Sequence, residues 1–242
     1  MKLLAWAITG AGHFLEEVFI TMGERSEDFK VTSFVSSAAE EVIRIYGLWD
    51  RLREISDGTH YSEIFTDRSE GASAIHSGRL ARGTYSALVV APATANTVAK
   101  ACRGIADTLV TNAIAQALKG EVSVLILPTD QSESTETTIP LRVEPDLCVG
   151  CVPCPAEQAC ENGAFRVREG KGSIDYLRCV GCNLCLEACN YGAVKRGEKI
   201  RVTAREVDLE NVERLRKMRG ITVLRNLEEL GEALNKHLRH EP

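Results

Sequence analysis

The chain has 242 residues, of which 44% are hydrophobic and 26% charged, and its formal net charge is −5. This balance is typical of a globular protein with one large domain, or with a medium domain and a small one. The negative charge and the 5% of aromatic residues give no indication of nucleic-acid binding. No apolar run approaches the roughly 18 residues that span a bilayer. We therefore expect a cytoplasmic protein without a membrane or nucleic-acid partner.

Apolar runs typical of buried strands alternate with amphipathic segments typical of helices. This alternation predicts an α/β domain, Rossmann-like or flavodoxin-like, in which helices cover both faces of a parallel sheet. The strands expected ahead of the cysteine-rich segment are 2–9, 30–36, 86–92 and 122–128, and the helices between them are 13–25, 37–47, 94–104 and 106–120.

Two strand ends look suited to a phosphate. The first strand runs into Thr9-Gly10-Ala11-Gly12-His13, where glycines let backbone N–H groups approach an anion at a helix start. Leu15 occupies the third glycine position of a dinucleotide fingerprint, and the second strand ends in Val35-Ser36-Ser37 without an acid for a ribose. This pattern favours a mononucleotide over NAD, and an ordinary tight turn is the alternative.

The segment Ala91-Pro92-Ala93-Thr94-Ala95-Asn96-Thr97 is more specific. It resembles the PASANT motif of the flavoproteins that include the phosphopantothenoylcysteine and lantibiotic cysteine decarboxylases. The resemblance implies FMN bound at a subunit interface, in a homo-oligomer built on trimers. It also implies a set of FMN-binding candidates: Gly10, Ala11, Ser36, Thr94, Ala95, Asn96 and Thr97. Thr94 is equally suited to cap the helix that follows it.

Other positions depart from the decarboxylases. Their Pro-Ala-Met-Asn substrate motif is replaced by Leu127-Pro128-Thr129-Asp130, so cysteine decarboxylation is not expected. His76 lies roughly where the family has its catalytic histidine, in different surroundings. No catalytic residue is assigned; His76 and Asn96 are the candidates, and Arg79 and Asp107 are further polar groups expected near the flavin.

A Ser- and Thr-rich segment, 131–138, reads as a mobile linker. Two cysteine sets follow it, Cys148-x2-Cys151-x2-Cys154-x5-Cys160 and Cys179-x2-Cys182-x2-Cys185-x3-Cys189, and each opens with Cys-Val-Gly-Cys. This duplication is similar to two-cluster ferredoxins, in which the fourth thiolate of each [4Fe–4S] cluster comes from the other repeat. We expect Cys148, Cys151, Cys154 and Cys189 to hold one cluster, and Cys179, Cys182, Cys185 and Cys160 to hold the second. Structural zinc and disulfides are the rival readings, which the triple spacing and the compartment disfavour.

Strand and helix patterns resume after the cysteines, with a strand at 200–208, a helix near 209–219, a strand at 220–226 and a helix at 227–238. We therefore expect a discontinuous FMN-binding domain, 1–143 and 200–242, interrupted by a ferredoxin-like domain, 144–199. This architecture resembles archaeal iron–sulfur flavoproteins described as dihydromethanopterin reductases. The resemblance implies a ferredoxin or similar one-electron donor and a pterin substrate. An electron-transfer flavoprotein without a small-molecule substrate is the alternative.

Overall fold

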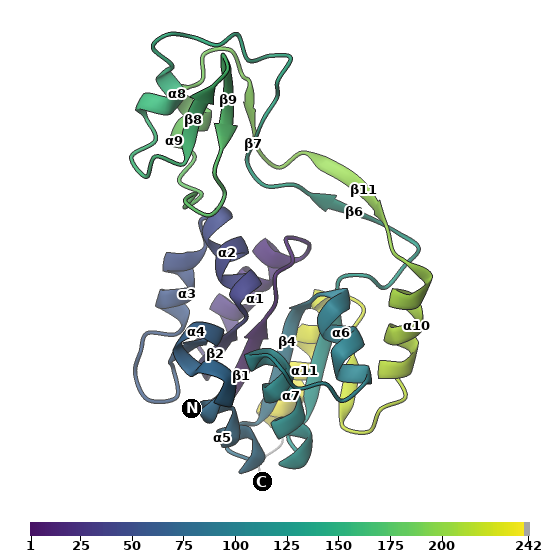
Figure 1. Ribbon diagram of the computed structural model, residues 1–242. Helices are drawn as coiled ribbons and strands as arrows, with labels where there is room; N and C mark the ends of the chain where they lie inside the picture. Colours follow the sequence, from purple (N-terminus) through teal and green to yellow (C-terminus); the bar gives the residue numbers. More distant parts are fainter. Residues whose placement is uncertain (240–242) are drawn as a thin grey trace.

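A computed structural model describes residues 1–239 of the chain (Figure 1). Its centre is a six-stranded sheet in which every neighbouring pair of strands is parallel. In spatial order the strands are β12 (Ile221–Val223), β5 (Val124–Pro128), β4 (Ala87–Ala93), β1 (Lys2–Ile8), β2 (Phe29–Val35) and β3 (Ile64–Thr66). This is the Rossmann order, in which the chain turns in opposite directions from β1 and β4. Ligands of such sheets bind at the carboxyl ends of the strands beside that switch point.

Helices cover both faces of the sheet, and each face has its own buried core. The first core contains residues of α1 (Leu15–Arg25), α2 (Ser37–Ile45), α3 (Trp49–Ile55) and α11 (Leu227–Arg239). The second contains residues of α5 (Gly78–Ala81), α6 (Ala95–Cys102), α7 (Leu109–Lys119) and α10 (Glu206–Leu215). Between β3 and α5 lie α4 (Asp67–Glu70) and the short 3-10 helices η1 (Gly71–Ser73) and η2 (Ile75–Ser77). The α/β prediction is confirmed.

A separate small unit lies between β5 and α10 in the sequence (Figure 1). Its core of Leu141, Ala156, Phe165, Cys185 and Val194 is independent of the two cores of the sheet domain. Its elements are β7 (Arg142–Val143), α8 (Pro155–Gln158), β8 (Phe165–Arg168), β9 (Lys171–Ile174), α9 (Leu184–Ala188) and β10 (Val194–Lys195). The β7–β10 and β8–β9 pairs are antiparallel. We call this unit the inserted module.

A two-stranded antiparallel ribbon connects the inserted module to the sheet domain. It consists of β6 (Ser134–Thr138) and β11 (Lys199–Thr203). The expectation of a mobile linker at 131–138 is wrong for β6, and the strand expected at 200–208 pairs in this ribbon rather than in the main sheet. Both strands are rich in polar residues, so their backbones pair with each other in solvent instead of entering a buried sheet.

Boundaries shift elsewhere as well. The helix expected near 209–219 begins three residues earlier, at Glu206, where Asp208 and Arg205 form a reciprocal cap. Sequence patterns did not predict α3 or the three-residue strand β3, because short elements carry too few residues for a clear periodicity. Among residues 1–239, no helix is both long and apolar enough to cross a bilayer.

Candidate functional site

Two turns meet at the carboxyl ends of β1 and β4, and the Thr9 side chain joins them. The Thr9 hydroxyl donates to the carbonyl of Pro92 at 2.7 Å and accepts from the backbone N–H of Thr94 at 2.8 Å. Thr9 is only 2% exposed. The glycine turn, residues 9–13, and the motif, residues 91–97, are therefore held in one fixed arrangement. Thr9 was absent from the predicted site residues, although its place at a strand end before a glycine could have indicated it.

Replacing Thr9 by valine should lower the free energy of unfolding by about 1–3 kcal/mol, the usual cost of leaving a buried partner unsatisfied. Thr21→Val is the matched control, because the Thr21 hydroxyl makes one exposed hydrogen bond to the Glu17 carbonyl at 3.1 Å. Urea unfolding followed by circular dichroism measures both. Equal losses in the two variants would contradict the bridging role of Thr9.

Backbone donors remain free in the glycine turn. The Ala11 N–H bonds the Thr9 carbonyl at 2.8 Å, whereas no hydrogen bond within residues 1–239 takes the N–H groups of Gly10, Gly12 or His13. A Cβ on Gly10 would lie 2.5 Å from that of Ala38, so the turn can approach α2 this closely only with glycine. The turn thus offers several backbone donors to an anion.

Two of the predicted FMN-binding residues, Ser36 and Thr94, cap the N-termini of α2 and α6. The Ser36 hydroxyl accepts from the N–H of Ala39 at 3.2 Å, and that of Thr94 accepts from the N–H of Thr97 at 3.4 Å. The capping alternative for Thr94 is therefore observed, and it leaves the N–H groups of Ala95 and Asn96 at the first turn of α6. Asn96 is exposed.

The carboxylate of Asp67 bonds the first amides of two helices near this edge of the sheet, α2 and α7. Asp67 accepts from the backbone N–H of Ser37 at 2.7 Å through Oδ2, and from that of Leu109 at 2.7 Å through Oδ1. Negative charge is favourable at both helix N-termini. Because Asp67 uses the first amides of α2 and α7, those two N–H groups are not available to a ligand, whereas the donors of the glycine turn and of the start of α6 are. Sequence reasoning missed Asp67, since nothing local shows that it reaches two distant helices.

Two further titratable groups lie at this edge. Burial lowers the pKa of His13 from its usual value, and the charges of Glu17 and Asp130 only partly oppose this shift. Asp130 follows β5 and accepts a 2.6 Å hydrogen bond from the Thr129 hydroxyl. The lowered pKa favours the neutral imidazole of His13. Both were missed as site residues, although each directly follows a strand end or its turn.

The polar candidates His76, Arg79 and Asp107 make their contacts away from the glycine turn and the motif. The His76 ring stacks on Phe65 with centroids 4.1 Å apart, and its Nδ1 is 2.8 Å from Oε1 of Glu70, whose side chain is 4% exposed. Asp107 pairs with Lys100 at 2.8 Å at the surface.

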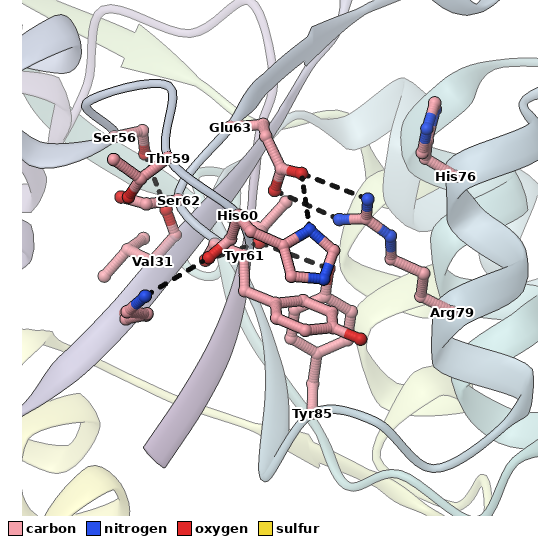
Figure 2. Close-up of polar contacts among 12 residues, drawn as sticks. Val31, Ser56, Thr59, His60, Tyr61, Ser62, Glu63, His76, Arg79 and Tyr85 are labelled. Atoms are coloured by element: carbon pink, nitrogen blue, oxygen red, sulfur yellow. Dashed lines mark hydrogen bonds and ion pairs between the residues drawn. The ribbon is translucent and has the colours of Figure 1, made fainter. Parts of the chain in front are cut away.

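Arg79 makes two 3.0 Å hydrogen bonds to Glu63. Burial opposes ionisation of Glu63, but the hydrogen bonds and charge of Arg79 outweigh it and lower the pKa of that carboxyl. Figure 2 shows the Glu63–Arg79 pair facing Tyr61 and Tyr85, with His76 set apart from it. Within the described chain, none of His76, Arg79 and Asp107 has a hydrogen bond or ion pair to the glycine turn or the motif.

Eight of the nine cysteines line two cavities in the inserted module. The first is lined by Cys148, Cys151, Cys154 and Cys189, and the second by Cys160, Cys179, Cys182 and Cys185. Phe165 lies in the wall of both cavities. All nine cysteines are free thiols. Within residues 1–239, no three His, Cys, Asp or Glu side chains converge on a point suited to a single metal ion.

Two short helices explain how each cavity draws on both repeats. α8 begins directly after Cys154 and carries the chain from the first cavity toward Cys160 in the second. α9 contains Cys185, in the second cavity, and ends at Ala188, directly before Cys189 in the first. Because the two helices pack against each other, each repeat delivers its last cysteine to the other repeat's cavity.

The thiols differ in their surroundings. Burial raises the pKa of Cys179, and it raises that of Cys185 to about 11. Backbone N–H groups reach two of the sulfurs: that of Phe165 lies 3.2 Å from Cys160 Sγ, and that of Gly172 lies 3.2 Å from Cys148 Sγ. Such N–H···S contacts stabilise thiolates and tune the groups that thiolates bind.

Gly150 and Gly181, inside the cysteine loops, have positive φ angles of 68° and 65°. A Cβ on Gly150 would clash with the backbone of Gly170, and one on Gly181 with the backbone of Gly47. The tight fit is against neighbouring backbone.

Comparison with known proteins adds three findings. The sequence model of the family described as Flavoprotein matches residues 2–142. A Methanosarcina mazei protein named dihydromethanopterin reductase (acceptor) is 43% identical to this chain, and the match covers 95% of this chain and 97% of the relative. A Methanocaldococcus jannaschii protein of the same name is 42% identical, and the match covers 97% of this chain and 96% of the relative. The crystal structure of Burkholderia xenovorans DmrB with FMN, described as a cubic protein cage for redox transfer, matches with a TM-score of 0.63 and 29% identity, covering 98% of this chain and 95% of DmrB.

Proposed function

Because this chain belongs to the Flavoprotein family, we propose that it is an FMN-dependent oxidoreductase that reduces dihydromethanopterin to tetrahydromethanopterin. The proposed electrons come singly from a low-potential donor, such as a ferredoxin, through two [4Fe–4S] clusters to FMN. Relatives 42–43% identical over nearly the whole chain carry the name of this reaction. The observation that carries the redox route is the presence of two four-cysteine cavities in a module inserted into the flavoprotein fold.

The edge of the sheet beside β1 and β4 fits FMN. The unpartnered N–H groups of the glycine turn and of the first turn of α6 are suited to the FMN phosphate. Thr9 fixes these two donor groups relative to each other. The residues we propose to bind FMN are Gly10, Ala11, Ser36, Thr94, Ala95, Asn96 and Thr97. In this proposal Ser36 and Thr94 act by holding the helix starts, since their hydroxyls serve as caps.

The two cavities fit iron–sulfur cubes. Each offers four thiols and no carboxylate, imidazole or basic side chain, a donor set that matches a [4Fe–4S] cluster. The proposed ligands are Cys148, Cys151, Cys154 and Cys189 for the first, and Cys160, Cys179, Cys182 and Cys185 for the second. Thiols as buried as Cys185 must lose their protons when they bind metal, so cluster assembly would release protons. Free thiols suit a reducing compartment, and we propose the cytoplasm.

The overall reaction balances as two electrons and two protons added across a C=N bond, which gives CH–NH. When bound, the clusters supply single-electron transfer and FMN supplies two-electron hydride chemistry. The chain's own residues would bind and orient these groups. DmrB is described as a cage, and we propose that this chain also assembles as a homo-oligomer built on trimers, with FMN at the subunit interface. His76, oriented by the buried Glu70, and Asn96 remain candidates for contacts with the substrate.

The test is an anaerobic assay on purified holoprotein. About eight irons and one FMN per chain are expected, and reduced ferredoxin should drive consumption of dihydromethanopterin. If the bound flavin is reduced but the pterin is not consumed, the substrate assignment is wrong. If reduced flavin is then reoxidised only by a partner protein, the chain is an electron carrier instead.

A further inference from the structure

The two Cys-Val-Gly-Cys loops have the same sequence but different neighbours. The loop of the second cysteine set is seated on the sheet domain: a Cβ on Gly181 would clash with the backbone N of Gly47 and lie 2.6 Å from the carbonyl oxygen of Ile45. For the corresponding glycine of the first loop, Gly150, the three atoms nearest to a would-be Cβ all belong to Gly170 of the inserted module itself. Figure 1 shows the inserted module above the end of α2 and the start of α3, where Gly47 lies.

Side chains hold this contact in place. The Tyr46 hydroxyl donates to the carbonyl of Thr138, at the end of β6, at 3.0 Å. Arg196, after β10, donates through Nη2 to the Tyr46 carbonyl at 3.2 Å and to Glu16 of α1 at 3.0 Å. The turn that follows α2 is thus fixed to both strands that enter and leave the inserted module.

Tyr46 also touches the glycine turn. A Cβ on Gly12 would clash with the Tyr46 hydroxyl oxygen and lie 3.0 Å from Cζ of the same ring. Tyr46 itself is 7% exposed. Gly12, Tyr46, Gly47 and Gly181 therefore form one continuous line of packed residues, which we call the glycine–tyrosine contact. It runs from the turn proposed to bind FMN to the loop of the second cysteine set.

The surroundings of the two sets differ accordingly. Cys182 and Gly181 line a groove together with Arg44, Gly47 and Trp49 of the sheet domain. Both cavities themselves are lined only by residues of the inserted module, so the contact of the second set with the sheet domain is made along its loop, outside the cavity. In the loop of the first set, Val149 and Val152 are 59% and 94% exposed. Because electron tunnelling falls steeply with distance, the set whose loop packs against the sheet domain is the better placed to reach a flavin bound there.

We propose that the second cysteine set, Cys160, Cys179, Cys182 and Cys185, is the one that exchanges electrons with the flavin, and that the glycine–tyrosine contact positions it. The inference rests on the function proposed above and adds an order to it: the first set lies upstream, toward the external donor. Tyr46, Gly47 and Arg196 are positioning residues in this inference, because none of them lines either cysteine cavity.

Gly47→Leu tests the inference without altering a cysteine loop. Gly47 has a φ of +73°, and any side chain there is directed at the Gly181 carbonyl, 2.9 Å from the would-be Cβ. Gly58→Leu is the matched control: Gly58 also has a positive φ, +85°, but open space surrounds its would-be Cβ. Arg196→Gln is the second variant, with Lys195→Gln as its control, in case Gly47→Leu folds poorly.

Full-chain holoprotein with its iron and FMN contents measured is mixed with reduced ferredoxin, and flavin bleaching is followed by stopped flow. Gly47→Leu should slow bleaching by about tenfold or more, since a displacement of ~1 Å at a reacting centre can cost up to ~100-fold. Hydrogen exchange, read on the same samples, should rise at residues 45–48 and 179–183. Arg196→Gln should also slow flavin bleaching and raise hydrogen exchange at these residues. Neither control variant should change the bleaching rate or the exchange.

The outcomes separate this inference from the proposed function. If Gly47→Leu and Arg196→Gln raise hydrogen exchange at the contact but leave bleaching at the wild-type rate, the second set is not the proximal one. If both variants keep wild-type exchange, the contact does not hold the loop, and the inference is equally overturned. If iron-depleted wild type bleaches as fast as the holoprotein, the electron route of the proposed function fails instead.

Discussion

Replacing Cys189 by alanine should remove about four irons per chain, and replacing Cys151 as well should remove no more, because the proposed assignment gives both thiols to the same cluster. Cys151 and Cys189 belong to different repeats yet line one cavity. By contrast, the pair Cys151→Ala and Cys160→Ala, taken from a single repeat, removes one thiol from each cavity and should leave almost no iron. Iron and acid-labile sulfide assays on anaerobically purified protein measure the difference.

The control for this series is Cys102→Ala. Cys102 is the ninth cysteine, and its Sγ donates to the Asn211 carbonyl at 3.0 Å between α6 and α10, away from both cavities. Its removal should leave the iron content unchanged. If the Cys151/Cys160 double variant kept half of the iron while the Cys151/Cys189 pair lost all of it, each repeat would hold its own cluster and the crossed assignment would be wrong.

Replacing Trp6 by alanine should lower the free energy of unfolding by about 3–5 kcal/mol, the range for deleting a large buried aromatic side chain. Trp6 is fully buried in the core beneath α1 and α11, and its indole N–H donates to the Ala91 carbonyl at 3.0 Å. Ala91 begins the motif that leads to the start of α6. The same side chain therefore supports the core and fixes the strand end beside the proposed FMN site.

Trp49→Ala is the comparison for Trp6→Ala. Trp49 is half-buried beneath Arg44, whose guanidinium carbon lies 4.2 Å from the ring centroid, and its Nε1 has no hydrogen-bond partner among the described residues. Trp49→Ala should lower the free energy of unfolding by less, about 0.5–3 kcal/mol, the range of most substitutions. Urea unfolding followed by far-ultraviolet circular dichroism gives both values. Trp6→Phe keeps an aromatic ring in the core but removes the indole N–H, so it should lower the free energy of unfolding by about 1–3 kcal/mol, the cost of leaving the Ala91 carbonyl without this donor. Equal losses for Trp6→Ala and Trp49→Ala would contradict the core role of Trp6.

Much of the fold could be predicted because its signals are local. Strands such as β1 and β4 are continuous apolar runs, which is the pattern of a sheet buried on both faces. Thr94 and Ser36 mark the helix starts because a short hydroxyl side chain can bond an amide of the first turn. The weakest predictions concerned polar strands: β6 was read as a linker because nothing in its sequence shows that β11, some 60 residues away, would pair with it.

Three of the residues that were missed share one property. Thr9, Asp67 and Tyr46 each act on a segment distant in the chain: Thr9 on Pro92, Asp67 on Leu109, and Tyr46 on Thr138. A hydroxyl or carboxylate has no local pattern that reveals such a partner. By contrast, the cysteines were found because several thiols at short, repeated spacings are rare without a shared ligand.

Local sequence patterns were enough to predict the α/β class, the phosphate-suited turn after the first strand, and the eight thiols with their repeated spacing, because periodicity, glycine and cysteine are readable over a few residues. They could not predict that the second cysteine loop, rather than the first, rests on the sheet domain through Gly47 and Gly181. The two loops share one local sequence, so nothing within either loop distinguishes them. Which of them meets the sheet domain depends on how the ribbon and the turn after α2 pack in three dimensions.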